Sequence, residues 1–376
     1  MIDQPLPRTM PRDDPEHRNF REDALALSRL RHRSRARFTT RRRPGAASRP
    51  QSETQATSRR YVGRRVVAVV PVLWGVTFVT FILMNLLPGN AARAQLGPDA
   101  SDAQVHALAV KLHLTGSFLS RYLHWLTALL RGSLGRSVAS GQPVSSIVIQ
   151  RLPVSAELVV LAIGCALIGA VPVAVLSARW PGGIIDRAAT VAAVASVSVA
   201  PFILATGLIA LFAVDLGWLP AIGYVPLGQD FVRNLRGLVL PVAAVALPLF
   251  GGYTRVLRGD LVDQVLTAHH IESARALGMS PWQILLRHAL RNSLLGLVTL
   301  VGFNLGTLIG GAVIVEQVFG LPGLGSELVQ AIDARDVPVI QAVVMVFALG
   351  VVLASLLSDL AYRRLDPRIR LDGAPA

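Results

Sequence analysis

Long apolar runs, separated by charged segments, dominate the pattern of this chain. Six windows contain no Asp, Glu, Lys or Arg and are apolar on every helical face: residues 66–87, 158–176, 188–214, 237–254, 292–315 and 337–358. A bilayer core about 30 Å thick is crossed by roughly 20 helical residues, so these windows are long enough to span it. Membrane strands would instead alternate polar and apolar residues. The pattern therefore predicts an all-α polytopic membrane protein with six transmembrane helices.

The loop of residues 260–292, between the fourth and fifth windows, has the pattern of a helical hairpin. Apolar positions follow helical spacing from Leu261 and end near Gly278, which can take the left-handed conformation that stops a helix. Ser280 then suits an N-cap, and Gln283 three residues later completes a capping box. The apolar residues of the second helix are expected on one face: Trp282, Leu285, Leu286 and Ala289.

The segment between the first two windows, residues 88–153, is predicted to be a long outer loop. It contains one amphipathic helix, because apolar residues recur there at three- and four-residue steps: Leu119, Tyr122, Leu123, Leu126, Leu129 and Leu130. Such a helix can lie on the membrane surface or dock a partner, and the pattern does not distinguish the two. On the same side, the glycine-rich residues 320–325 are predicted to form a turn or a re-entrant element.

The formal net charge of +14 changes the picture mainly at the N-terminus. Residues 1–60 mix arginine clusters with acidic residues, proline and serine, which predicts a disordered, Arg-rich cytoplasmic tail. This tail can contact anionic lipid head groups, whereas no folded basic module accompanies the charge, so nucleic acid is not an expected partner. Arginines also gather in residues 260–292 and after the sixth window, so the positive-inside rule places both termini in the cytoplasm.

The chain lacks the residues that ATPases and membrane enzymes require. Lys111 is the only lysine and is not part of a phosphate-binding Gly-Lys-Ser or Gly-Lys-Thr loop. His269, His270 and Glu272 do not form a His-Glu-x-x-His pattern, and all eight histidines lie outside the six windows. We therefore expect no catalytic residue, no metal and no directly bound cofactor. An ion-gradient secondary transporter is the alternative of another class, disfavoured because no window carries a mid-membrane ionisable group.

Asn304 and Thr307 are polar residues one helical turn apart in the fifth window. Either could line a translocation path, and hydrogen bonding between helices is the simpler explanation for both. The sequence offers no further candidates for contact with a transported solute.

Several motifs resemble one family. Glu272-Ser273-Ala274 followed by Gly278 is similar to the Glu-Ala-Ala motif of inner-membrane permease subunits of ATP-binding-cassette (ABC) importers, in the dipeptide, oligopeptide and nickel group. Ser273 replaces the middle alanine, and His288 and Arg291 stand where that motif has Ile and Pro, as in the peptide branch. Other matching stretches follow in family order over about residues 58–370: Leu86-Leu87-Pro88-Gly89, Leu134-Gly135-Arg136-Ser137, Arg151-Leu152-Pro153, Leu216-Gly217-Trp218-Leu219-Pro220, Glu316-Gln317-Val318-Phe319 and Leu365-Asp366-Pro367-Arg368.

This resemblance implies a type I importer transmembrane domain over residues 61–376, in a multi-pass protein of the inner membrane. The coupling loop to a separate ATPase would consist of Glu272, Ser273, Ala274, Arg275, Ala276, Leu277 and Gly278. The implied function is ATP-driven import of dipeptides or oligopeptides, with nickel or another small solute as the alternative within the family. The implied partners are a second, homologous permease in a heterodimer, two ABC ATPase subunits that use ATP and Mg, an extracytoplasmic solute-binding protein, and membrane lipids.

The resemblance does not extend over residues 1–57. We expect this extension to be either a tail specific to a lineage or the product of a start site assigned too far upstream. In both cases it would be dispensable for transport.

Overall fold

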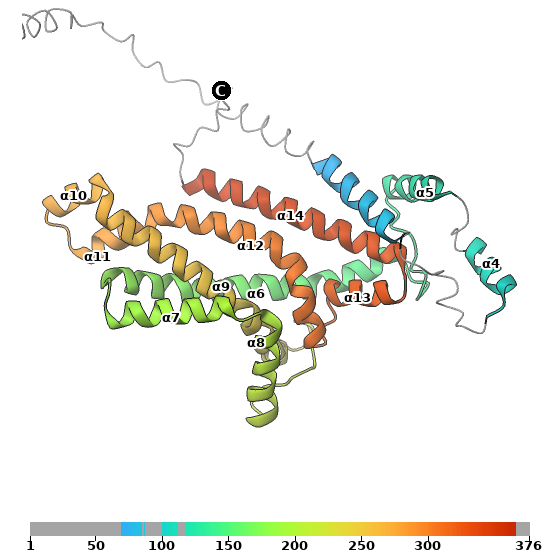
Figure 1. Cartoon of the computed structure of the whole chain (residues 1–376), viewed down its shortest axis with the longest axis horizontal. Helices are drawn as coiled ribbons and strands as arrows, with labels where there is room; N and C mark the ends of the chain where they lie inside the picture. The colour runs from blue at the N-terminus through green and yellow to red at the C-terminus, as the bar shows by residue number, and fades with distance from the viewer. Residues whose placement is uncertain (1–68, 85, 87–99, 112–116, 366–376) are drawn as a thin grey trace, which may run out of the picture. The chain divides into compact units, whose positions relative to one another are not determined.

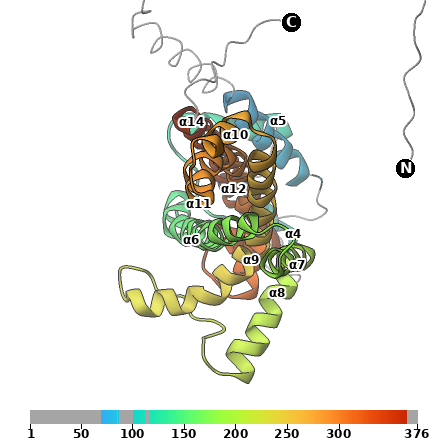
Figure 2. The same ribbon diagram turned by 90° about the vertical axis from the view of Figure 1, so that its left-hand side faces the viewer.

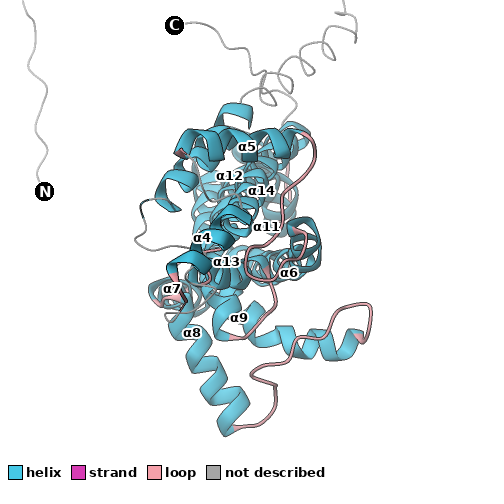
Figure 3. Cartoon of the chain, turned by 90° about the vertical axis from the view of Figure 1, so that its right-hand side faces the viewer, coloured by secondary structure: helices cyan, strands magenta, loops and turns pink. Residues whose placement is uncertain are grey.

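The structure, a computed structural model, describes residues 69–84, 86, 100–111 and 117–365. In this part of the chain every regular element is a helix, and the one β feature is an isolated bridge between Arg136 and Pro143 (Figure 3). The prediction of an all-helical membrane protein is thereby confirmed for the described residues. The predicted N-terminal tail, residues 1–60, lies outside them.

The elements follow one another in Figure 1 after a first helix, Val69–Met84. They are α4 (Asp102–Lys111), α5 (Phe118–Leu130), α6 (Val144–Arg179), α7 (Ile184–Ser198), α8 (Pro201–Leu208), η1 (Ile209–Asp215), α9 (Phe231–Thr267), α10 (His269–Ala276), α11 (Pro281–Gln283), η2 (Ile284–Ala289), α12 (Leu290–Val318), α13 (Leu324–Asp333) and α14 (Val337–Leu365). The segments η1 and η2 are π-helical, with wider turns than an α-helix.

Four helical segments are long and apolar enough to cross a membrane: Val144–Arg179, Phe231–Thr267, Pro281–Val318 and Val337–Ala361. A fifth span results if Ile184–Ser198 and Pro201–Asp215 are counted together, although they are bent by 100°. The first helix, Val69–Met84, is shorter than these segments over its described residues. The structure therefore shows four to five apolar spans, and the prediction of six crossings stays a prediction.

The third predicted window, residues 188–214, is not one straight helix. Val199 and Ala200 have extended backbones, and Pro201 begins α8. A proline has no N–H for the preceding turn and disfavours helical backbone in the residue before it, so it suits the start of a new helix. This window consequently forms two helices at an angle.

Small residues set the spacing at the centre of the bundle. α6 packs along α9, α7 and α12 also contact α9, and α14 contacts α12 (Figures 1 and 2). An added Cβ at Gly251 of α9 would lie 2.4 Å from the Ala193 carbonyl oxygen of α7, so only glycine fits there. A ridge of alanines four residues apart on α6 is fully buried: Ala162, Ala166, Ala170 and Ala174. Such small side chains let helix backbones approach closely.

A second hydrophobic cluster lies where the N-terminal end of α6 meets α13 and the start of α14. Its members are Val144, Ile147, Val148, Leu324, Ala331, Val339, Ile340, Ala342 and Val343. An ion pair between Arg151 of α6 and Glu327 of α13, 3.2 Å apart, lies at the same end. Because α6 begins at Val144, the last ten residues of the predicted outer loop, residues 88–153, are helical.

Residues 320–323 of the predicted glycine-rich element form a turn that leads into α13, and Leu324 and Gly325 are its first helical residues. The buried Glu316 carboxylate, at the end of α12, accepts hydrogen bonds from the Ser155 hydroxyl at 2.7 Å and the Ser326 N–H at 3.0 Å. An added Cβ at Gly323 would lie 2.3 Å from this carboxylate. Glu316 therefore joins α6, α12 and α13, and glycine is needed where the turn passes it.

α5 is the predicted amphipathic helix, and it packs on the first helix through aromatic rings. Tyr122 is buried, with its ring 5.3 Å from that of Phe78 and 5.4 Å from that of Phe81. Its hydroxyl lies 3.2 Å from the Thr77 hydroxyl. Part of the predicted apolar face is exposed: Leu119, Leu123 and Leu130. Both predicted roles of this face, membrane contact and docking, stay predictions.

Candidate functional site

The predicted hairpin lies at one end of the bundle, where α10 and α11 connect α9 to α12 (Figure 1). Its first arm differs from the expectation of one helix between Leu261 and Gly278. α9 ends at Thr267, Ala268 is extended, and α10 begins a new helix. The Arg275 guanidinium donates a hydrogen bond to the Val265 carbonyl oxygen at 3.0 Å. This contact satisfies a backbone carbonyl near the C-terminal end of α9 and supports the break.

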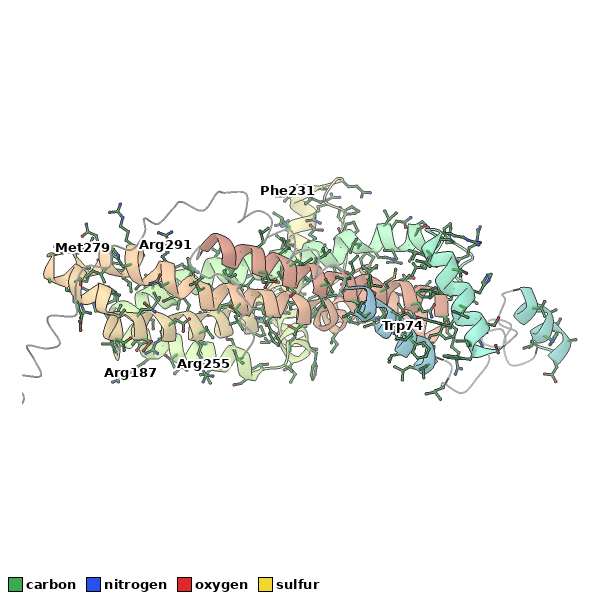
Figure 4. The ribbon with its side chains drawn as sticks, turned by 90° about the horizontal axis from the view of Figure 1, so that it is seen from above. Trp74, Arg187, Phe231, Arg255, Met279 and Arg291 are labelled. Atoms are coloured by element: carbon green, nitrogen blue, oxygen red, sulfur yellow. The ribbon has the colours of Figure 1, made fainter. Side chains whose placement is uncertain are left out.

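The hairpin turns sharply at Gly278, as predicted. Gly278 has a φ of +76°, its N–H donates to the Arg275 carbonyl at 3.0 Å, and the Met279 N–H donates to the Ala274 carbonyl at 3.2 Å. These two bonds form a Schellman motif, in which a left-handed residue closes the end of a helix. Figure 4 labels Met279 at this end of the bundle. The side chain before the glycine, that of Leu277, is 82% exposed.

The second arm begins with the predicted capping box. The Ser280 N–H donates to the Gln283 side chain at 3.0 Å, and the Gln283 N–H donates to the Ser280 hydroxyl at 3.3 Å. The expected single apolar face of this arm is wrong, because Leu285 and Ala289 are buried but Trp282 and Leu286 are exposed. The π-helical turns of η2 hold more residues than α-helical turns, so an α-helical period misplaces side chains here.

The seven residues of the predicted coupling loop divide between core and surface. Ala274 is buried, together with Ile271 one turn earlier, and both belong to the main hydrophobic core. The other six are exposed: Glu272, Ser273, Arg275, Ala276, Leu277 and Gly278. The burial of Ile271 was not predicted from the sequence. Its spacing of three residues from Ala274 places both on one face of a helix and could have indicated it. The hairpin is thus attached to the bundle by one face and presents the other.

Asn304 and Thr307 have different side-chain neighbours, and their predicted place along a translocation path stays a prediction. The Asn304 side chain lies beside the buried Tyr253 hydroxyl of α9. Thr307 lines a groove of about 490 Å³ between α12 and α14. The same groove is lined by polar residues that sequence reasoning missed: Thr299, Ser355, Ser358 and Asp359. Asp359 directly follows the sixth apolar window, and this position in the sequence could have indicated that its carboxylate lies at the end of a membrane helix.

Metal chemistry has no visible basis in the described part of the chain. Among residues 69–84, 86, 100–111 and 117–365, no group of three or more His, Cys, Asp or Glu side chains is arranged to hold a metal ion. Residues 272–278 of the hairpin offer instead an exposed surface with one carboxylate, one guanidinium and one leucine, which suits contact with another protein.

The apolar spans and the ordered hairpin define the class: a multi-pass, all-helical membrane protein. Residues 170–371 match the family model of the binding-protein-dependent transport system inner membrane component, and residues 58–159 match the model of the N-terminal part of such proteins. The chain belongs to this family. It is the permease subunit of a binding-protein-dependent ABC importer of the inner membrane, a non-catalytic transport component that works with ATPase and binding-protein partners. The alternative of an ion-gradient transporter is thereby set aside.

Curated relatives match over nearly their full length. A putative peptide transport system permease protein of Brucella abortus (strain 2308) is 38% identical over 309 residues, 82% of this chain and 98% of that protein. An oligopeptide transport system permease protein of Bacillus subtilis (strain 168) is 34% identical over 312 residues, with the same coverage of both chains. A glutathione transport system permease protein of Salmonella typhi is 35% identical over 311 residues, again 82% and 98%. Among solved structures, the inward-facing MetNI methionine ABC transporter is 21% identical, with a TM-score of 0.49 over 58% of this chain and 96% of that one.

Proposed function

We propose that this permease forms the translocation path for peptides, either dipeptides or oligopeptides. The observation that carries the proposal is that relatives named for peptide, oligopeptide and glutathione transport match over 98% of their length. Glutathione is itself a tripeptide, so the three names share one chemistry. Nickel and other small solutes are the alternative cargo, and no structural feature of the described residues favours them.

The proposed assembly contains two permeases and two ATPases. A second, homologous permease completes the path in a heterodimer, and a solute-binding protein delivers the peptide from outside. ATP and Mg bind to the ATPase subunits and not to this chain. The family membership supports ATPase and binding-protein partners in general, and the copy numbers and the heterodimer are part of the proposal.

The hairpin is the proposed docking element for an ATPase subunit. Residues Glu272 to Gly278 would sit in a groove of the ATPase, with Leu277 at the centre of the contact. Support comes from the exposed leucine on a turn closed by two hydrogen bonds and from the burial of Ile271 and Ala274 behind it. A surface anchored in this way can carry the displacement of the ATPase into the bundle, and nucleotide binding would then favour one of two packings.

The proposed topology has six crossings with both termini in the cytoplasm. It counts the bent α7–α8 pair as one span and the first helix as another. Support comes from the apolar windows and from the concentration of arginines around the hairpin and after α14.

The cargo and the energy source can be tested together. The full-length chain would be affinity-purified with the subunits that accompany it and reconstituted into vesicles that enclose ATP and Mg. Labelled peptides of two to five residues and labelled Ni²⁺ would be offered outside with the solute-binding protein. We expect peptide uptake that requires both enclosed ATP and the binding protein.

Uptake of Ni²⁺ that unlabelled peptides do not reduce would overturn the peptide assignment. Peptide uptake of equal rate without enclosed ATP would overturn the coupling to ATPase subunits. Vesicles without the permease serve as the blank for both measurements.

A further inference from the structure

The end of the bundle that carries the hairpin holds a second ordered element. We call it the α6–α7 corner: residues 177–187, which comprise the end of α6, the connecting turn and the first turn of α7. It lies about 70 residues before the hairpin in the chain, yet its side chains contact α9 just before the first arm and Trp282 in the second arm.

The contact with α9, just before the first arm, is an ion pair with a buried carboxylate. The Asp186 carboxylate, 4% exposed, accepts hydrogen bonds from Nε and Nη2 of Arg258 on α9, the latter at 2.7 Å. It also accepts from the Ser177 hydroxyl and, at 2.8 Å, from the Gly182 N–H. The carboxylate therefore ties α6, the turn and α7 to α9, close to the point where α9 enters the hairpin. A two-bond guanidinium–carboxylate contact also fixes the orientation of both groups.

The contact with the second arm is aromatic. Trp180 of the corner lies edge-to-face on Trp282 of α11, with ring centroids 6.0 Å apart and an interplanar angle of 82°. The guanidinium of Arg179 lies 5.2 Å from the centre of the Trp180 ring. Edge-to-face rings and a cation over a ring are both favourable arrangements. Trp282 is thus held by the corner and not by the apolar face of its own arm.

These two contacts decide how a displacement of the hairpin spreads. A hairpin attached only through its own arms would move α9 and α12. With the corner attached to α9 and to the second arm, α6 and α7 must follow or the ion pair must break, and breaking it leaves the buried Asp186 carboxylate without its counter-charge. Packed, rigid elements with discrete contacts are the means by which movements pass through helix bundles.

We propose that the α6–α7 corner is a second coupling element, which transmits movement of the hairpin to α6 and α7. In this proposal Asp186 and Trp180 are positioning residues that act through Arg258 and Trp282. The proposal rests on the docking of the hairpin on an ATPase, as proposed above. It assigns a role to residues outside the Glu-Ala-Ala motif.

The test is the number of ATP molecules hydrolysed per solute taken up. Asp186→Asn and Trp180→Ala would be measured in the complete complex, reconstituted in vesicles with the binding protein. We expect this ratio to rise about threefold or more in each variant, because ATP hydrolysis continues while α6 and α7 no longer follow the hairpin. The conservative Arg258→Lys keeps a positive charge opposite Asp186 and should stay closer to the wild-type ratio than Asp186→Asn.

A matched control exists at the other end of α6. Arg151 and Glu327 form a pair 3.2 Å apart whose side chains are 30% and 15% exposed, compared with 30% and 5% for Arg258 and Asp186. Glu327→Gln should leave the ratio unchanged. Membrane abundance and thermal unfolding of each variant would be measured alongside.

The outcomes separate the two proposals. Wild-type vesicles that hydrolyse ATP without binding-protein-dependent uptake would refute the proposed function, whatever the corner does. If the wild type is coupled and the corner variants lose hydrolysis and uptake by the same factor, the corner only stabilises the fold and the inference is overturned. If Asp186→Asn does not accumulate in the membrane, Trp180→Ala decides, and an unchanged ratio in this variant overturns the inference.

Discussion

Gly278 combines a left-handed backbone with free space around its Cα atom. A Cβ at this position would meet no atom within 4 Å, so any cost of substitution arises from the φ of +76° and not from a clash. L-residues in this region cost about 1–2 kcal/mol, whereas glycine adopts it readily. The position therefore tests the geometry of the turn without disturbing the core.

Gly278→Val is expected to leave the protein in the membrane and to uncouple ATP hydrolysis from uptake, because the Schellman turn no longer presents Leu277 in one orientation. The measurement is ATP hydrolysis and solute uptake in reconstituted vesicles. Gly259→Ala is the control, since this glycine of α9 also has an open Cβ position but no positive φ. Normal uptake by Gly278→Val would refute the role of this turn.

At the end of the bundle opposite the hairpin, Glu316 joins α6, α12 and α13 through its hydrogen bonds. Glu316→Ala removes the acceptor for the Ser326 N–H, which is buried, and for the Ser155 hydroxyl, which is half-buried. Leaving a buried donor unsatisfied costs roughly 1–3 kcal/mol, and the half-buried hydroxyl adds less, so we expect a loss of about 1–3 kcal/mol in unfolding free energy. Thermal unfolding of the purified permease in detergent would measure it. Asp333→Ala, on the exposed end of α13, should change the midpoint little, and an equal effect of the two substitutions would contradict this account.

The elements of the hairpin are specified by local signals of unequal strength. The capping box and the glycine turn follow from side chains that bond the adjacent backbone, so a sequence pattern is enough to find them. The break at Ala268 and the π-helical segment η2 have no comparable local signal. They depend on how the arms meet the bundle, through Arg275 on one side and through Leu285 and Ala289 on the other.

Ser280→Ala is expected to destabilise the start of the second arm by about 1 kcal/mol, because the Gln283 N–H loses its acceptor. Faster hydrogen exchange over residues 281–285 would reveal it. Ser273→Ala, in the middle of α10, is the matched control, because alanine is the best helix former. Equal exchange in both variants would show that the capping box contributes nothing.

In the proposed six-span topology, the hairpin and the connection between η1 and α9 lie on opposite sides of the membrane. Cysteine labelling tests this directly, since Cys165 is the only cysteine of the chain. In a Cys165→Ser background expressed without the ATPase subunits, Leu277→Cys should react with a membrane-impermeant maleimide only from the cytoplasmic side. Leu227→Cys should react only from the outside. Both positions carry exposed side chains.

Labelling of both cysteines from one side would contradict the topology, because α9, which lies between the two positions, would then not cross the membrane. If the bent α7–α8 pair returns to the side from which it entered, each cysteine should instead react from the side opposite to the expected one. Pretreatment with an unlabelled maleimide of the same kind, added to intact cells, controls for leakage. Retained uptake activity of the Cys165→Ser background, measured with the ATPase subunits present, shows that the assembly is intact.

The sequence by itself determined that the chain is a helical membrane protein, where its apolar segments lie, and how the hairpin turns. Hydrophobic runs, prolines, glycines and caps act on their own neighbours in the chain, and the order of the motifs indicated the family. Only the tertiary structure decided which residues meet across the bundle. The ion pair of Asp186 and Arg258 joins positions 72 residues apart, and the contact of Ser155 with Glu316 joins positions 161 apart. No local pattern encodes such pairs, because they depend on how whole helices pack against one another.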